Sequence, residues 1–187
     1  MSKVFNSGRR PFVVLDRDGT IIVERPYLSD PDDVELIPGV GHSLFALSRL
    51  GLGLLVVTNQ SGVGRGYFSQ VTLAQVHDRL SRLLEAEGVK LDGIYFCPHL
   101  PEDLCGCRKP ETGMVERAAG QLGLDPFASF VVGDNQADIE LGHRMGATTF
   151  LVRTGYGTEV ESTVDSDYVV DDIVGAASII QLLVEQK

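Results

Sequence analysis

Four short polar groups in this 187-residue chain each follow an apolar run or the loop after one. In chain order they are DRDGT at 16–20, TNQ at 58–60, RKP at 108–110 and GDNQAD at 133–138. Asp16 and Asp18 lie two residues apart and can face one reaction centre if the chain turns there, which Gly19 permits. Asp16 would then attack phosphorus as a nucleophile. Asp18 would protonate the leaving alkoxide and later activate water.

A phosphate monoester is a dianion, so it would repel a bare carboxylate nucleophile. A Mg²⁺ ion held by Asp16, Asp134 and the backbone carbonyl of Asp18 would neutralise charge on both groups, and oxygen ligands suit this cation. The sequence therefore predicts a magnesium site.

The remaining polar groups fit the binding of a phosphoryl group. Lys109 can hold it as a point charge, and Thr58 and Asn59 can donate hydrogen bonds to its oxygens. Asp138 lies four residues after Asp134, on the same face of a predicted helix. We expect Asp138 to pair with Lys109 rather than to bind metal.

The elements that must position these groups alternate along the chain. Apolar runs predict buried strands over 12–15, 54–57, 94–96, 130–132 and 148–152. Amphipathic patterns predict helices over 40–50, 71–87, 114–122 and 136–145, with an N-cap at Ser69 and closing glycines at Gly123 and Gly146. An edge strand within 165–172 and a helix over 173–184 follow. This order predicts an α/β fold with a mostly parallel sheet, helices on both faces and ligands beyond the carboxyl ends of the strands.

The three cysteines of the chain lie in one segment together with a histidine. The four residues are Cys97, His99, Cys105 and Cys107. Their types and close spacing match a closed, tetrahedral Zn²⁺ site, which we interpret as structural. The site would fix the loop that ends just before Arg108 and Lys109. The alternative is a set of reduced cysteines beside an unrelated histidine. The other histidines, His42, His77 and His143, are expected to be ordinary surface or half-buried residues.

Composition indicates one compact domain. With 43% hydrophobic and 22% charged residues, a chain of 187 residues can bury one core. We expect residues 1–10 to form an N-terminal tail and residues 11–187 a single domain. The net charge of −10 and the lack of a basic block disfavour nucleic acid and membrane partners. No apolar leader or long apolar run is present, so we expect a cytoplasmic location, and we expect a monomer.

The chain resembles the haloacid-dehalogenase (HAD) superfamily of phosphatases, and within it the D-glycero-D-manno-heptose-1,7-bisphosphate phosphatases. The resemblance rests on LDRDGTI at 15–21, VVTNQSGVGRGYF at 56–68, LDGIYFCPHLP at 91–101, CRKPETGM at 107–114, VVGDNQAD at 131–138 and LVRTGYG at 151–157. It spans about residues 12–157. It implies a Rossmann-like HAD fold and Mg²⁺-dependent hydrolysis of a 7-phosphate through an aspartyl-phosphate, in the biosynthesis of nucleotide-activated heptose and lipopolysaccharide.

The resemblance also implies roles for individual residues. Asp16 is the nucleophile and Asp18 the acid/base, Thr58 and Lys109 steady the phosphoryl group, and Asp134 completes the Mg²⁺ site. The substrate-binding residues that we expect are Glu24, Arg25, Pro26, Tyr27, Asn59, Gln60, Ser61, Arg65 and Arg108, with Arg65 on a second phosphate. The intervals in which caps insert, 21–38 and 88–108, are short, so we expect no large cap domain.

Other functions remain open. The segment CPHLPEDLCGCRKP at 97–110 resembles the zinc loop of histidinol-phosphate phosphatases at least as closely. A phosphoacceptor module, in which phosphorylation of an aspartate is a signal, and a zinc-stabilised binding protein without catalysis are further alternatives. A dinucleotide-binding loop at GVGRG, 62–66, is disfavoured because its third glycine comes one position early.

Overall fold

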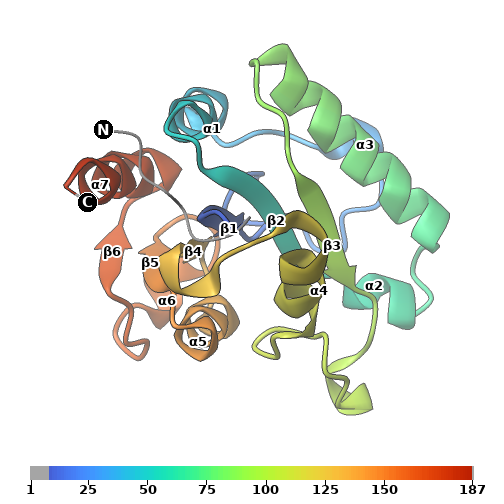
Figure 1. Ribbon diagram of the computed structural model, residues 1–187. Coiled ribbons are helices and arrows are strands. Elements are labelled where there is room, and N and C mark those ends of the chain that lie inside the picture. Colours follow the sequence, from blue (N-terminus) through green and yellow to red (C-terminus); the bar gives the residue numbers. More distant parts are fainter. Residues whose placement is uncertain (1–8, 187) are drawn as a thin grey trace.

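The structure, a computed structural model, describes residues 9–186 and is built on a six-stranded sheet (Figure 1). Its strands are β1 (Phe12–Leu15), β2 (Gly53–Asn59), β3 (Gly93–Cys97), β4 (Phe130–Gly133), β5 (Thr148–Val152) and β6 (Tyr168–Val170). They lie in the order β3-β2-β1-β4-β5-β6, and every pairing is parallel. The predicted strands are confirmed, and the sheet is wholly rather than mostly parallel.

The helices follow the predicted pattern. They are α1 (Val40–Arg49), α2 (Ser61–Gly64), α3 (Gln70–Ala86), α4 (Gly113–Leu122), α5 (Gln136–Met145), α6 (Gly157–Val160) and α7 (Ile173–Glu185), with short 3-10 turns η2 (Pro31–Asp33), η3 (Pro101–Asp103) and η4 (Pro126–Ala128). The Ser69 side chain caps α3 by accepting from the N–H of Thr72 at 3.1 Å. Gly123 and Gly146 end α4 and α5 in the left-handed conformation.

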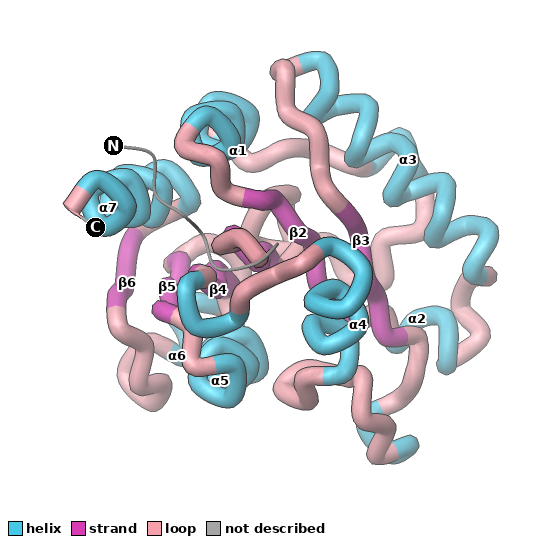
Figure 2. Tube along the Cα trace, viewed as in Figure 1, coloured by secondary structure: helices cyan, strands magenta, loops and turns pink. Residues whose placement is uncertain are grey.

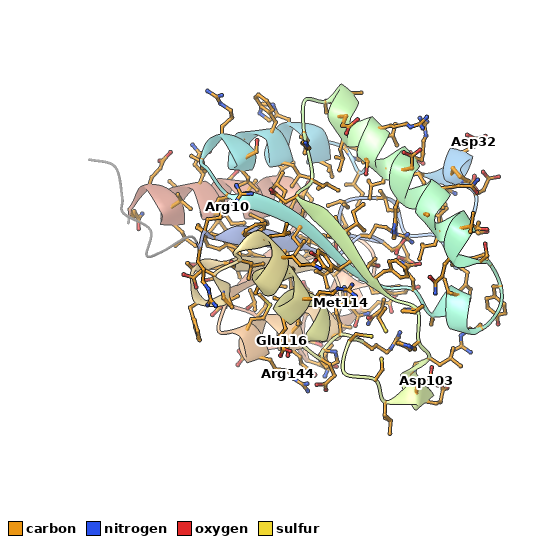
Figure 3. All side chains as sticks on the ribbon, turned by 45° about the vertical axis from the view of Figure 1, so that its right-hand side comes forward. Arg10, Asp32, Asp103, Met114, Glu116 and Arg144 are labelled. Atoms are coloured by element: carbon orange, nitrogen blue, oxygen red, sulfur yellow. The ribbon has the colours of Figure 1, made fainter. Side chains whose placement is uncertain are left out.

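The sheet separates two hydrophobic cores because successive side chains of a strand point to opposite faces. In β1, Val13 and Leu15 face the core covered by α1, α3 and α7, whereas Phe12 and Val14 face the core covered by α4 and α5 (Figure 1). In α4, Met114 is buried against the sheet and Glu116 is exposed on the outer side of the helix (Figure 3).

Two loop segments lie beyond the carboxyl ends of the strands. In the described chain, residues 16–39 between β1 and α1 contain only η2, and residues 98–112 between β3 and α4 contain only η3 (Figure 2). Neither interval holds an inserted domain, which confirms the expectation of a fold without a large cap. No helix within residues 9–186 is both long and apolar enough to cross a bilayer.

Arg10, the last residue of the expected N-terminal tail, is bonded to other parts of the chain. Residues 1–8 lie outside the described part of the chain. The N–H of Arg10 donates to the carbonyl of Gly123 at 2.9 Å, and its carbonyl accepts from the N–H of Asp125 at 2.9 Å. Its guanidinium also pairs with Asp92. Arg10 is therefore attached to the body of the protein. Nothing in the sequence indicated this, because a backbone bridge needs no apolar residue.

His77 also differs from expectation, because it is buried rather than half-buried or on the surface. It is 9% exposed, its Nε2 has no hydrogen-bond partner among the described residues, and its ring lies 5.7 Å from that of Phe96. Burial, helped by the positive charge of Arg17, lowers the pKa of His77 to about 4. The imidazole is thus neutral in the folded protein at physiological pH.

The burial of His77 predicts a loss of stability in acid. Between pH 6.5 and pH 4 only the unfolded chain binds the proton, so the free energy of unfolding falls as the pH decreases through this window. The full contribution is roughly 3 kcal/mol. Urea denaturation at pH 7 and pH 4.5 should therefore show a smaller loss of stability for His77→Leu than for the wild type. The matched control is His42→Leu at an exposed site, and equal losses in wild type and His77→Leu would contradict this account.

Candidate active site

A pocket of about 390 Å³ opens at the carboxyl ends of β1, β2 and β4. Strand β1 lies between β2 and β4, which is where the strand order reverses and where ligands bind in sheets of this kind. The lining residues are Asp16, Arg17, Asp18, Glu24, Arg25, Pro26, Tyr27, Leu28, Thr58, Asn59, Gln60, Ser61, Gly62, Arg108, Lys109, Asp134, Asn135, Ala137, Asp138 and Tyr156. All the predicted catalytic residues therefore meet in one pocket.

Lys109 is buried at the base of this pocket. Its Nζ lies 2.7 Å from Asp16 Oδ1, 2.6 Å from Asp138 Oδ1 and 2.7 Å from the carbonyl of Val57. Burial opposes the charge of the ammonium, but the carboxylates of Asp138 and Asp16 raise the pKa of Lys109 above its usual value. The predicted pair of Asp138 and Lys109 is present. The carbonyl of Val57 accepts a hydrogen bond from the ammonium, and the carboxylates of Asp16 and Asp138 lie within ion-pair distance of it.

Asp134 is held by two hydrogen bonds, one from the turn after β1 and one from the segment after β5. The hydroxyl of Thr20 donates to Asp134 Oδ1 at 3.3 Å, and the N–H of Tyr156 donates to Oδ2 at 2.8 Å. Gly19 adopts a φ of 74°, and a Cβ at this position would collide with Asp134 Oδ2. The glycine of the DRDGT segment therefore permits the turn, as predicted, and also the close approach of the carboxylate.

The acidic groups fit a divalent cation. Carboxylate oxygens of Asp16, Asp134 and Asp138 lie within 4.8 Å of one another. Burial raises the pKa of Asp16 to about 6 and that of Asp134 to about 8, and the neighbouring carboxylates add to both shifts. Such a cluster favours a positive counter-charge. Asp138 uses Oδ1 on Lys109 and Oδ2 on the N–H of Asn135, in line with the predicted pairing of Asp138 with Lys109.

Asp18 is oriented by two neighbours. Both its oxygens accept from the guanidinium of Arg17, and Oδ2 also accepts from Gln60 Nε2 at 2.8 Å. Gln60 Nε2 donates in addition to Thr58 Oγ1 at 2.9 Å. Sequence reasoning missed Arg17, which stands between the two aspartates, because an arginine is normally expected to be exposed.

Asn59 lines the pocket, and its side-chain amide is bonded to the backbone of Lys109. Its Oδ1 accepts from the N–H of Lys109 at 3.0 Å, and its Nδ2 donates to the carbonyl of Lys109 at 3.1 Å. The amide group thus fixes the backbone of Lys109 instead of presenting a free side chain to a phosphoryl oxygen. A contact between residues so distant in the chain carries no local signal in the sequence.

The four residues expected to contact substrate after the first motif, 24–27, all line the pocket. Burial, together with the negative charges of Asp18 and Asp16, raises the pKa of Glu24 to about 7. Arg25 donates to the carbonyl of Asp33 and to Glu35, each at 3.1 Å, so its guanidinium is tied to its own loop.

Two other arginines were expected to bind substrate, and the structure separates them. Arg108 lines the pocket, and its Nη1 donates to the carbonyl of His99 at 3.3 Å. Arg65 is exposed in the turn after α2 and does not line this pocket. The prediction for Arg65 took a glycine-rich turn near β2 to face the pocket, but Ser61 and Gly62 are the residues of this segment that do so.

The predicted soft ligands form a second cluster, at the base of residues 98–112. One ligand atom from each of Cys97, His99, Cys105 and Cys107 lies within 4.8 Å of the others. His99 Nδ1 lies 3.5 Å from Cys97 Sγ and 3.3 Å from Cys107 Sγ, and the Sγ atoms of Cys97 and Cys105 are 3.5 Å apart. Three sulfurs and one imidazole nitrogen at this spacing fit a tetrahedral zinc ion without an open position.

Comparison with known proteins decides the family. The curated D-glycero-β-D-manno-heptose-1,7-bisphosphate 7-phosphatase of Haemophilus ducreyi is 41% identical over 170 residues, which cover 87% of this chain and 93% of that protein. The chain belongs to the D-glycero-β-D-manno-heptose-1,7-bisphosphate 7-phosphatase family. The Escherichia coli (strain K12) protein of the same name is 37% identical over 171 residues, covering 87% of this chain and 90% of that one.

Solved structures of the heptose bisphosphate phosphatases agree with the fold. The crystal structure of D,D-heptose 1,7-bisphosphate phosphatase from B. bronchiseptica, complexed with magnesium and phosphate, matches with a TM-score of 0.85 and 32% identity, over 94% of this chain and 99% of that one. The corresponding enzyme of Burkholderia thailandensis matches with a TM-score of 0.71 and 31% identity, over 92% and 99%. A family model described as HAD-hydrolase-like matches residues 106–176. The recognised superfamily and fold are thus confirmed.

Proposed function

We propose that this chain hydrolyses the 7-phosphate of D-glycero-β-D-manno-heptose 1,7-bisphosphate, as part of nucleotide-activated heptose and lipopolysaccharide biosynthesis. The observation that carries the proposal is Asp16, held by Lys109 and facing Asp134 in the pocket, in a chain 41% identical to a phosphatase of that name. The names of the relatives support the β anomer. They also support turnover, rather than a phosphoacceptor module or a binding protein without catalysis.

Asp16 is the nucleophile in this proposal. Lys109 contacts Oδ1, so we assign the attack on phosphorus to Oδ2. The bond from phosphorus to the sugar oxygen breaks as the bond to Asp16 forms, which gives an aspartyl-phosphate. Lys109 and the hydroxyl of Thr58 stabilise the charge on the transferring group, because Thr58 accepts from Gln60 and has its own proton left to donate.

Asp18 handles the protons in both halves of the reaction. Its carboxyl group gives a proton to the leaving alkoxide as the sugar departs. The carboxylate so formed then accepts a proton from the water that attacks the aspartyl-phosphate, which releases phosphate and restores Asp16. Asp16, Asp134 and the backbone carbonyl of Asp18 would hold Mg²⁺, which when bound supplies neutralisation of negative charge on nucleophile and phosphate.

In this proposal Arg108 binds the second phosphate of the substrate. Arg25 is tied to Glu35, and Arg17 is tied to Asp18. Arg108 makes a single hydrogen bond, to the carbonyl of His99, so it has donors left for a phosphate. We propose Arg108 as the group that distinguishes a bisphosphate from a monophosphate.

The test compares kcat/KM for the β and α anomers of heptose 1,7-bisphosphate, fructose 1,6-bisphosphate and histidinol phosphate. We expect the β-heptose bisphosphate to be preferred. A higher kcat/KM for histidinol phosphate would favour the second candidate, which rests on the five residues between His99 and Cys105 in the zinc loop. Arg108→Met should raise KM for the bisphosphate more than for a monophosphate.

We further propose that the cluster of three cysteines and His99 holds one structural Zn²⁺. The cluster lies directly before Arg108 in the chain, and the carbonyl of His99 accepts from Arg108. Metal binding would therefore set the position of the substrate-binding arginine as well as stabilise the loop.

Loss of one zinc ligand gives a measurable prediction. Cys107→Ser should lower the bound zinc from about one per chain to near zero, because a tetrahedral site that loses a thiolate binds far more weakly. It should also lower the melting temperature and raise KM for the bisphosphate. Elemental analysis, thermal unfolding and steady-state kinetics measure these three effects. Full zinc content or unchanged KM in the variant would contradict the assignment.

A cytoplasmic location, a monomeric state and a single domain after a short N-terminal tail stay predictions of the sequence.

A further inference from the structure

A buried arginine lies directly behind the proposed acid/base. The side chain of Arg17 is 1% exposed, and that of Asp18 is 18% exposed. Arg17 contacts both oxygens of its neighbour, since Nε donates to Oδ2 at 3.0 Å and Nη2 donates to Oδ1 at 2.8 Å. A bidentate pair fixes the plane and direction of a carboxylate, which a single contact does not do.

The surroundings of Arg17 reinforce this pairing. Its carbonyl accepts from the N–H groups of Thr20, Ile21 and Ile22 at 3.4, 3.0 and 3.1 Å, so the turn after β1 holds its backbone. Within residues 9–186 its only ion pair is with Asp18. The neighbouring His77 is neutral in the folded protein, because burial and the charge of Arg17 lower its pKa to about 4. The positive charge of Arg17 is thus directed at Asp18.

Gln60 completes the arrangement from the other side. The amide nitrogen of Gln60 faces Asp18 and donates to Oδ2 at 2.8 Å. A carboxylate has about four lone-pair sites, and Arg17 and Gln60 occupy three of them here. The one site left is on Oδ1.

We propose that Arg17 is a positioning residue that, together with Gln60, fixes Asp18 so that its free Oδ1 site carries the transferred proton. This inference rests on the proposed role of Asp18. In the first half of the reaction the proton leaves Oδ1 for the alkoxide oxygen as the bond from that oxygen to phosphorus breaks. In the second half Oδ1 takes a proton from water while the water oxygen bonds to phosphorus and Asp16 leaves.

The test is a double-mutant cycle with Arg17→Lys and Asp18→Asn. A lysine keeps the charge but cannot form the fork, so Arg17→Lys should lower kcat for the sugar bisphosphate by roughly 10- to 100-fold with little change in KM. In the Asp18→Asn background the same change should alter the rate by less than about twofold, because the group that Arg17 positions is already lost. A purely structural role would lower the rate equally in both backgrounds.

A second readout uses p-nitrophenyl phosphate, whose leaving group needs no acid. Arg17→Lys should spare the formation of the aspartyl-phosphate and slow its hydrolysis. The variant should therefore release about one equivalent of nitrophenolate per site in a burst, followed by slow turnover. Gln60→Met, which removes the other contact to Asp18, should show the same signature more weakly and serves if Arg17→Lys does not fold. Arg82→Lys, on the exposed side of α3, is the matched control and should leave every parameter unchanged.

Three outcomes separate the possibilities. Non-additive losses with a burst support the proposal. If Arg17→Lys lowers the rate by the same factor in both backgrounds, or does not lower it at all, the role of Arg17 is overturned. The role of Asp18 stands in that case as long as Asp18→Asn itself is strongly impaired. Full activity of Asp18→Asn would overturn the proposed acid/base and this inference with it.

Discussion

Asp16→Asn is expected to abolish turnover of the bisphosphate, with kcat lower by roughly 10⁴-fold or more. An amide is a far weaker nucleophile than a carboxylate and forms no stable bond to the phosphoryl group. It also removes one of the carboxylates that we propose as ligands for Mg²⁺. Steady-state phosphate release at saturating Mg²⁺ measures the loss.

Stability supplies the control for Asp16→Asn. Burial raises the pKa of Asp16 to about 6. Above that pH the carboxylate is ionised in the folded, metal-free protein, and this lowers the free energy of unfolding because the charge is better solvated in the unfolded chain. Replacing it with a neutral amide at pH 8 should therefore leave the melting temperature of the metal-free protein at least as high as that of the wild type. If Asp16→Asn is unfolded, its lack of activity says nothing about the nucleophile. The kcat and melting temperature of Asp16→Glu are therefore measured as well. Wild-type kcat in folded Asp16→Asn would contradict the mechanism.

Lys109→Met is expected to cause the largest loss of stability. The ammonium group is in contact with Asp16 and Asp138, both of which are largely buried. Removing it leaves two buried carboxylates without their cation and the carbonyl of Val57 without a donor. Breaking a buried ion pair in this way costs about 3–5 kcal/mol at neutral pH. Denaturant unfolding at pH 7 measures the change, and activity should be lost as well.

A second substitution tests the cause of that loss. Lys109→Met combined with Asp138→Asn should regain part of the lost stability, because one of the two uncompensated charges is gone. It should not regain activity. Lys90→Met, at an exposed lysine, is the matched control. If Lys109→Met were as stable as the wild type, or if Asp138→Asn made it less stable still, the buried charge cluster would not have the energetic role described.

Local patterns predicted most of the fold. Runs such as residues 12–15 and 130–132 are apolar on both faces because helices cover both sides of a parallel sheet, and that property can be read from sequence. The polar residues after the runs were correctly placed at one edge of the sheet. The sequence also predicted that Asp16 and Asp134 meet at one Mg²⁺ ion, whereas the order of the strands, including the pairing of β1 with β4, came only from the structure.

The parts that could not be predicted are contacts made by buried polar groups. Asn59 was assigned to the phosphoryl group, but its amide binds the backbone of Lys109, 50 residues away. Arg17 and His77 have types that are more often exposed, so nothing local indicates that both are buried. A net charge of −10, taken alone, disfavours the binding of an anion. That charge describes the whole molecule and not the pocket, whose lining includes Arg108 and Lys109 beside its acids.

The most direct test of the proposed reaction is to follow the two phosphates of D-glycero-β-D-manno-heptose 1,7-bisphosphate separately by ³¹P NMR, with the purified protein and Mg²⁺. We predict that the 7-phosphate signal is replaced by inorganic phosphate while the anomeric phosphate stays on the sugar, and that omitting Mg²⁺ prevents the change. Loss of the anomeric phosphate first, or no release of phosphate from this substrate, would contradict the proposed function.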